Sequence, residues 1–150
     1  MQSKDSDLMP KRQTIGSCGY DFCLPEDVTF KPGKWTDIDT GVSFNDDMQT
    51  CSSEIKNPIP TYLCPTRWFM LVVPRSSLGM KYGFRFANSV GIIDCDYRDT
   101  IKARITVDKE LAMKKGERFM QGILIPYLVD YNEEQPTKTR NGGIGSTGHD

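Results

Sequence analysis

Two short segments carry groups that could do chemistry together. Residues 74–79 (Pro-Arg-Ser-Ser-Leu-Gly) offer a guanidinium, two hydroxyls and a run of backbone amides next to a glycine. These groups suit a phosphate, because arginine can donate to two phosphate oxygens at once and amides at a helix start favour an anion. Residues 88–98 (Asn-Ser-Val-Gly-Ile-Ile-Asp-Cys-Asp-Tyr-Arg) deliver the carboxylate of Asp94 directly from an apolar run. Together the segments predict metal-assisted hydrolysis of a nucleotide.

Asp94 is the candidate general base. The apolar residues 90–93 predict a strand that would fix the carboxylate in place, and base catalysis requires a fixed position. The nearby Asp96 has two interpretations: a supporting residue of the site, or a turn residue that caps its own backbone. Residues 74–79 also have a second interpretation, an ordinary turn that opens a helix with serine as its cap.

The composition indicates one soluble domain. The chain has 150 residues, of which 37% are hydrophobic and 26% are charged, and this length is enough to bury a core. No apolar run reaches the length of a membrane span, and residues 1–13 are too polar for a secretion signal. A formal net charge of −1 provides no general attraction to nucleic acid or to membranes. Positive charge for an anionic substrate must therefore be local.

The cysteines and the histidine argue against several kinds of site. The five cysteines form no Cys-x-x-Cys pair, and the one histidine, His149, is next to the last residue. This spacing argues against a zinc site and against a Ser-His-Asp or Cys-His enzyme. Free thiols predict a reducing compartment, the cytoplasm, which for a viral protein would be the host cytoplasm.

The elements that must position these residues are mainly strands. Short runs rich in Val, Ile, Phe, Tyr and Thr, bounded by Gly and Pro, predict an all-β single domain with jelly-roll-like wrapping. Three such runs are 68–73, 101–107 and 123–129, and one short helix is expected over 76–82.

Three segments are expected to lie outside the core. Residues 1–10 are polar and predict a flexible N-terminus. Residues 45–66, rich in proline, predict an inserted loop between two strands. Residues 133–150 are glycine-rich and nearly free of apolar side chains, which predicts a mobile C-terminal lid.

Five segments in a fixed order resemble the motifs of the trimeric dUTPase family, which includes viral and phage members. They are Cys-Gly-Tyr-Asp-Phe at 18–22, residues 74–79, residues 88–98, Gly-Glu-Arg-Phe-Met-Gln at 116–121 and Gly-Gly-Ile-Gly-Ser-Thr-Gly at 142–148. Any one of them is weak evidence, but five in sequence make a chance match very improbable. The resemblance implies a dUTPase-like (β-clip) distorted jelly roll that forms a homotrimer, with each site built from all three subunits.

The same resemblance implies hydrolysis of dUTP to dUMP and diphosphate, which keeps uracil out of DNA. Asp94 would align a water for attack on the α-phosphorus, with Mg²⁺ bridging the phosphates. Asp21 would hold the waters of the metal ion instead of ligating it directly. The implied substrate-binding residues are Arg75, Ser76, Ser77 and Gln121 for phosphate, Asn88, Gly91, Ile92, Ile93 and Lys102 of a β-hairpin over 88–102 for uracil, Tyr97 for the deoxyribose, and Arg140, Ile144, Gly145, Ser146 and Thr147 of the lid.

Base and sugar selection follow from shape and hydrogen-bond polarity. Cytosine reverses the donor and acceptor pattern of uracil, and each buried mismatch costs about 1–3 kcal/mol. Tyr97 would exclude a ribose 2′-hydroxyl, although a plain core aromatic is the alternative. Two lid positions depart from the family pattern: Ile144 stands where phenylalanine is common, and Arg140 is one residue closer to the Gly-Gly pair. A flexible tail is the alternative for the lid.

Two other functions fit parts of the sequence. A dCTP deaminase resembles the family through the second and third motifs, but it needs a glutamate about ten residues after Asp94, where this chain has Arg104. A regulatory binding protein would use residues 45–66 to dock a protein partner, as an addition to the enzyme. A tolerated surface loop is the alternative for that insertion.

Overall fold

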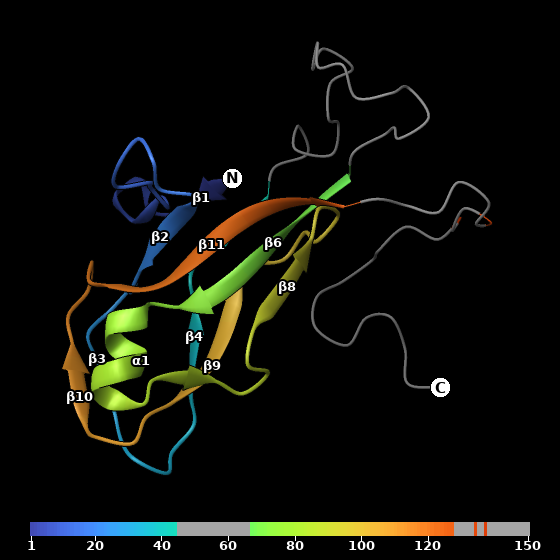
Figure 1. Cartoon of the computed structure of the whole chain (residues 1–150). Coiled ribbons are helices and arrows are strands. Elements are labelled where there is room, and N and C mark those ends of the chain that lie inside the picture. The colour runs from blue at the N-terminus through green and yellow to red at the C-terminus, as the bar shows by residue number, and fades with distance from the viewer. Residues whose placement is uncertain (45–66, 128–133, 135–136, 138–150) are drawn as a thin grey trace.

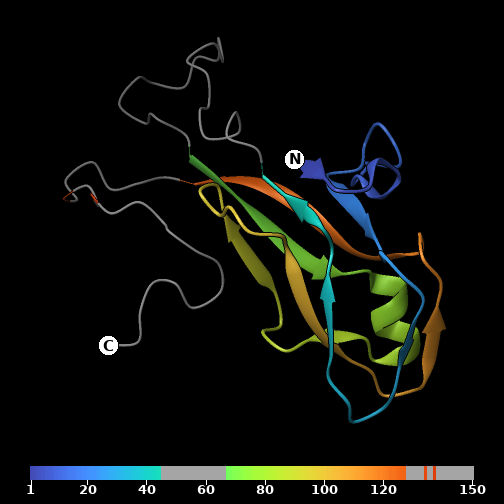
Figure 2. The ribbon, with the colours of Figure 1, turned by 180° about the vertical axis from the view of Figure 1, so that it is seen from behind.

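The computed structural model describes residues 1–44, 67–127, 134 and 137. Short strands and one α-helix make up this part of the chain, as Figures 1 and 2 show from opposite sides. The elements in chain order are β1 (Gln2–Ser3), a 3-10 helix (Ser6–Leu8), β2 (Gly19–Cys23), β3 (Val28–Phe30), β4 (Thr36–Asp39), β5 (Val42–Ser43), β6 (Arg67–Pro74), α1 (Ser76–Tyr82), β7 (Arg85–Phe86), β8 (Gly91–Asp94), β9 (Lys102–Thr106), β10 (Leu111–Met113) and β11 (Arg118–Tyr127). The predicted all-β class with one short α-helix is confirmed. No helix among the described residues is long and apolar enough to cross a membrane.

Antiparallel ladders join the strands into four sheets. The largest has the order β2–β11–β6–β8, and a second has the order β4–β9–β7. Two further pairs are β10–β3 and β1–β5. The long strands β6 and β11 run side by side along the molecule (Figure 1).

The core receives side chains from both larger sheets. Phe22 and Met70 come from the four-stranded sheet and Ile105 from the three-stranded one, and each is fully buried. In β9 the buried residues Ala103 and Ile105 alternate with the exposed Lys102 and Arg104, because successive side chains of a strand point to opposite faces.

The predicted helix over 76–82 is confirmed with the same bounds. Arg75 is its N-cap in an extended conformation, and Gly83 ends it with φ = 63°. Glycine adopts this left-handed conformation without a Cβ penalty, and its N–H donates to the carbonyl of Gly79 at 2.9 Å. The helix therefore begins directly after β6 and carries Ser76 and Ser77 in its first turn.

The predicted strands are confirmed, with shifted bounds. Runs 68–73 and 101–107 correspond to β6 and β9. Residues 123–127 of the third run are the end of a longer strand, β11, that starts at residue 118, and residues 128–129 lie outside the described residues. At the N-terminus, β1 pairs with β5, and Nζ of Lys115 lies 3.0 Å from a carboxylate oxygen of Asp5. The flexibility expected of residues 1–10 stays a prediction. The predicted insertion 45–66 lies outside the described residues, as does the predicted lid apart from positions 134 and 137.

The predicted hairpin over 88–102 is wrong. β8 pairs with β6, with Ile93 opposite Met70, while β9 pairs with β4 and β7. The chain between Asp94 and Lys102 therefore crosses from one sheet to the other. Because the two strands belong to different sheets, a cavity can open between them.

Candidate functional site

Most of the predicted site residues in the described part of the chain line one of two cavities. The arginine cavity has a volume of about 470 Å³, and the β8–β9 cavity about 560 Å³. The arginine cavity is lined by loop residues between 13 and 19 together with Asp21, Arg75, Ser76, Ser77, Arg118 and Gln121. The β8–β9 cavity is lined by residues of β4 and by Val72, Asn88, Gly91, Ile93, Lys102 and Arg104, among others. The two linings share no residue in the described part of the chain.

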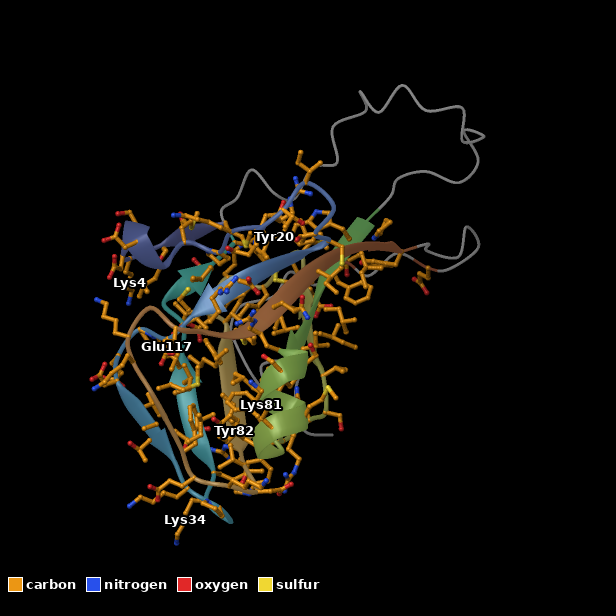
Figure 3. All side chains as sticks on the ribbon, turned by 60° about the vertical axis from the view of Figure 1, so that its left-hand side comes forward. Lys4, Tyr20, Lys34, Lys81, Tyr82 and Glu117 are labelled. Carbon is orange, nitrogen blue, oxygen red and sulfur yellow. The ribbon has the colours of Figure 1, made fainter. Side chains whose placement is uncertain are left out.

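Strand register assembles the arginine cavity. Asp21 of β2 is opposite Gln121 of β11, which is in turn opposite Val73 of β6. Directly opposed residues project from the same face of a sheet, so Asp21 and Gln121 point into one space. Arg75 follows Val73 by two residues and enters the same space. Figure 3 labels Tyr20, the residue before Asp21 on β2, and places it far from Lys34 in the turn between β3 and β4.

A β-bulge adds Arg118 to this face. Arg118 is opposite Cys23, but Met120 is opposite Phe22, so β11 carries one extra residue at Phe119. Without the bulge, Phe119 would stand opposite Cys23 on the face of Asp21. The extra residue lets Phe119 and Met120 both be fully buried and turns Arg118 toward the cavity.

Asp21 is the charged centre of the arginine cavity. Its side chain is 12% exposed, and its Oδ2 accepts a hydrogen bond from Nη1 of Arg118 at 3.0 Å. Nε of Arg75 lies 3.7 Å from the other carboxylate oxygen. Arg75 also donates to the carbonyl oxygen of Arg118 at 3.5 Å. Two arginines and one acid line this cavity among the described residues, so these three side chains leave one positive charge for an anion.

Gly19 makes room for Gln121. A Cβ at Gly19 would lie 2.6 Å from Oε1 of Gln121, closer than any real contact of this kind. Gln121 therefore needs glycine at position 19 to hold its amide in the cavity.

The β8–β9 cavity has an apolar interior and charged groups in its lining. Gly91 lies opposite Val72, where a Cβ would meet the valine Cβ at 3.3 Å. Asp37 and Arg104 form a two-point ion pair, with N–O distances of 2.7 and 2.8 Å. The hydrogen bond from the Arg104 guanidinium lowers the pKa of Asp37 below its ordinary value of 3.8. This cavity could hold a flat, mostly apolar group with polar edges.

Asp94 is the last residue of β8, where its side chain is exposed. Its backbone carbonyl accepts a hydrogen bond from the N–H of Tyr97 at 3.0 Å, which begins the turn out of the strand. Ile92, on the same face as Asp94, is 63% exposed and does not line the β8–β9 cavity, whereas its neighbours Gly91 and Ile93 do.

Tyr97 is 6% exposed and lines neither cavity in the described chain. Its hydroxyl donates to the carbonyl of Thr100 at 3.2 Å. This is the environment that the alternative interpretation, a core aromatic, predicts, and the sugar contact stays a prediction.

Asp94 and Arg75 are far apart within one chain. Asp94 stands opposite Phe69 of β6, and Arg75 is six residues further along the same strand direction. At about 3.3 Å per residue, their Cα atoms are separated by about 20 Å. A base that acts through one water on a bound phosphate needs both groups within a few hydrogen-bond lengths. One copy of the chain therefore does not bring Asp94, the candidate base, to its own arginine cavity.

The sequence did not predict Arg118 as a site residue. It also did not predict that the loop before β2 lines the arginine cavity. The signal for Arg118 was present, since Phe119-Met120 is an apolar pair that a regular strand would send to opposite faces. The predicted lid residues Arg140, Ile144, Gly145, Ser146 and Thr147 lie outside the described residues. Among the described residues, Cys18 and Cys23 form no disulfide.

Comparisons with known proteins agree with one another. A family model described as dUTPase matches residues 49–148. A deoxyuridine 5′-triphosphate nucleotidohydrolase from Lactococcus lactis subsp. lactis is 36% identical over 149 residues, covering 93% of this chain and 87% of that protein. A crystal structure of dUTPase from Streptococcus mutans is similar, with a TM-score of 0.63 and 27% identity over 85% of this chain and 91% of that one.

A dUTPase from phage phi11 of S. aureus, solved with a structural Mg(II) ion, is also similar, with a TM-score of 0.62. It is 16% identical, with 89% of this chain and 93% of that chain covered. At this identity the likeness shows the fold alone.

Proposed function

Because the chain belongs to the dUTPase family, we propose that it hydrolyses dUTP to dUMP and diphosphate and so keeps uracil out of DNA. The observation that carries the proposal is the 36% identity to a dUTP nucleotidohydrolase over 93% of the chain. The two cavities support it, since one suits phosphate groups and the other suits a base. The rival deaminase chemistry is disfavoured because Arg104 occupies the position of its glutamate and is paired with Asp37.

The arginine cavity would bind the phosphate groups. Arg75 can donate two hydrogen bonds to phosphate oxygens, and Gln121 can donate from a neutral amide. Ser76 and Ser77 add hydroxyls from the first turn of α1. Asn88 and Gly91 line the other cavity, where the uracil edge would meet the asparagine amide and the backbone.

The described residues fit a divalent metal ion only indirectly. They include no group of three or more His, Cys, Asp or Glu side chains that could hold such an ion. Asp21 is the one carboxylate in the lining of the arginine cavity, and it would contact the waters of an Mg²⁺ ion carried by the substrate. When bound, Mg²⁺ would neutralise charge that develops on the phosphate oxygens.

Asp94 would act as the general base. Its place at the end of a paired strand fixes the backbone, and its exposed carboxylate could accept a proton from an attacking water. The separation of about 20 Å along β6 from Arg75 supports a homotrimer with shared sites, in which one subunit supplies the base and another the arginine cavity.

The test is release of diphosphate from dUTP compared with dCTP, dTTP and UTP. We expect turnover of dUTP only. Asp94→Asn should lower kcat by about 10²–10⁴-fold while dUTP binding survives, because only the proton acceptor is lost. Asp108→Asn, a surface carboxylate paired with Arg85, is the matched control and should keep full activity. Equal turnover of all four nucleotides would contradict the proposed function, and full turnover by Asp94→Asn would remove Asp94 as the base.

A further inference from the structure

Two arginines share the carboxylate of Asp21 unequally. Nη1 of Arg118 lies 3.0 Å from one oxygen, within the range of a charge-assisted hydrogen bond. Nε of Arg75 lies 3.7 Å from the other oxygen, which is too long for a hydrogen bond. The charge of Asp21 is therefore met mainly by Arg118.

This division matters because Asp21 is largely covered. A covered carboxylate without a close cation is costly, so it attracts whichever cation can reach it. Arg75 is the other cation lining the arginine cavity in the described chain, and it is already within 3.7 Å. Without Arg118, the Arg75 guanidinium would close on Asp21 and become less available to an incoming anion.

We propose that Arg118 is a positioning residue: it neutralises Asp21 and thereby keeps Arg75 available for the phosphate groups of the substrate. This inference rests on the proposed function, because it assumes that phosphate groups bind in the arginine cavity. The bulge at Phe119 supports it, since that extra residue is what turns Arg118 toward Asp21. Bulges commonly re-aim a side chain beside a functional site.

The test is titration calorimetry of inorganic diphosphate into the full chain. Arg118→Gln should weaken diphosphate binding by about tenfold, the size expected when a charged hydrogen bond to phosphate is lost. Arg118→Lys, which keeps the positive charge, should bind more tightly than Arg118→Gln. Arg85→Gln is the matched control, because Arg85 pairs with Asp108 on the surface and lines neither cavity. It should bind as the parent chain does.

The decisive comparison repeats Arg118→Gln in an Asp21→Asn background. With the carboxylate gone, Arg75 has nothing to neutralise it, so the Arg118→Gln change should then weaken diphosphate binding by less than about twofold. The same tenfold loss in both backgrounds would show that Arg118 itself binds phosphate and would overturn the inference. Unchanged binding by Arg118→Gln in the parent background would also overturn it.

A failure of the proposed function can be distinguished from a failure of the role inferred for Arg118. A parent chain that cleaves dUTP but fails either comparison refutes only the role of Arg118. A parent chain that neither cleaves dUTP nor binds diphosphate refutes the proposed function, and the inference with it. Circular dichroism of each variant checks the fold, and Arg118→Lys supplies the reading if Arg118→Gln does not fold.

Discussion

The arginine cavity and the β8–β9 cavity are built by different physical means. In the arginine cavity, register across three strands and one bulge bring Asp21, Gln121 and two arginines to one face of one sheet. The β8–β9 cavity forms because β8 and β9, which are neighbours in the sequence, belong to different sheets. Apolar side chains line much of the space between these strands. In this protein the polar cavity is thus formed on one face of a single sheet, whereas the cavity proposed for the nucleobase lies between two sheets.

The two cavities also differ in which of the groups needed for the proposed reaction each of them lacks. The arginine cavity holds cations but no candidate base, since Asp94 is about 20 Å from Arg75 along β6. The β8–β9 cavity carries Asp94 on its strand but has no phosphate-binding loop among its described lining residues. Each cavity by itself lacks a group that the proposed reaction needs, and this supports the proposal that more than one copy of the chain forms the enzyme.

Subunit complementation gives the largest expected effect. Asp94→Asn and Arg75→Gln should each lower dUTP turnover by about 10²-fold or more. If one subunit supplies the base and another the arginine, unfolding and refolding an equal mixture should restore about a quarter of the parent activity, because half of the chains carry each intact group.

The control for complementation is each variant refolded alone, which should stay inactive. A mixture as inactive as its components would mean that base and arginine act from the same chain. That result would contradict the separation of the two cavities.

A methyl group at position 19 should affect the arginine cavity alone. Gly19→Ala places a Cβ against Oε1 of Gln121 and displaces the amide, so we expect diphosphate binding to weaken by about tenfold. Gly122→Ala is the matched control, because its Cβ would meet Met70 and Phe22 in the core. It should lower the free energy of unfolding by about 1–3 kcal/mol without a comparable loss of diphosphate affinity in the folded fraction. The reverse pattern would contradict the role assigned to Gly19.

Lowering the pH should have the smallest effect, a small loss of folding stability from the ion pair beside the β8–β9 cavity. The hydrogen bond from Arg104 lowers the pKa of Asp37 in the folded chain below 3.8, so the pair contributes stability above that value. The contribution is lost as pH falls through the lowered pKa and the carboxyl becomes protonated. Because both side chains are mostly exposed, the effect should be small.

The measurement is the thermal unfolding midpoint of the parent chain and of Asp37→Asn as a function of pH. The two should differ at neutral pH and converge in acid. A difference that grows as the pH falls would contradict this assignment.

Much of the fold could be predicted because its signals are local. Runs rich in Val, Ile, Phe, Tyr and Thr predicted β6 and β9, and the proline at position 74 predicted the start of α1, which Gly83 ends in the structure. The predicted hairpin over 88–102 was wrong because two strands that are adjacent in the sequence do not pair with each other. Strand pairing depends on segments that are distant in the sequence, and no local pattern predicts that β8 pairs with β6.

The amino-acid sequence by itself determined which chemical groups exist and where strands and the helix begin, because propensity, turn residues and motif spacing act over a few residues. Tertiary structure alone decided which groups meet. It put Arg118 beside Asp21 through a bulge, and it sent β8 and β9 to different sheets. It also set Asp94 about 20 Å from Arg75. These outcomes depend on pairing between segments far apart in the chain, where burial of the shared core selects the register.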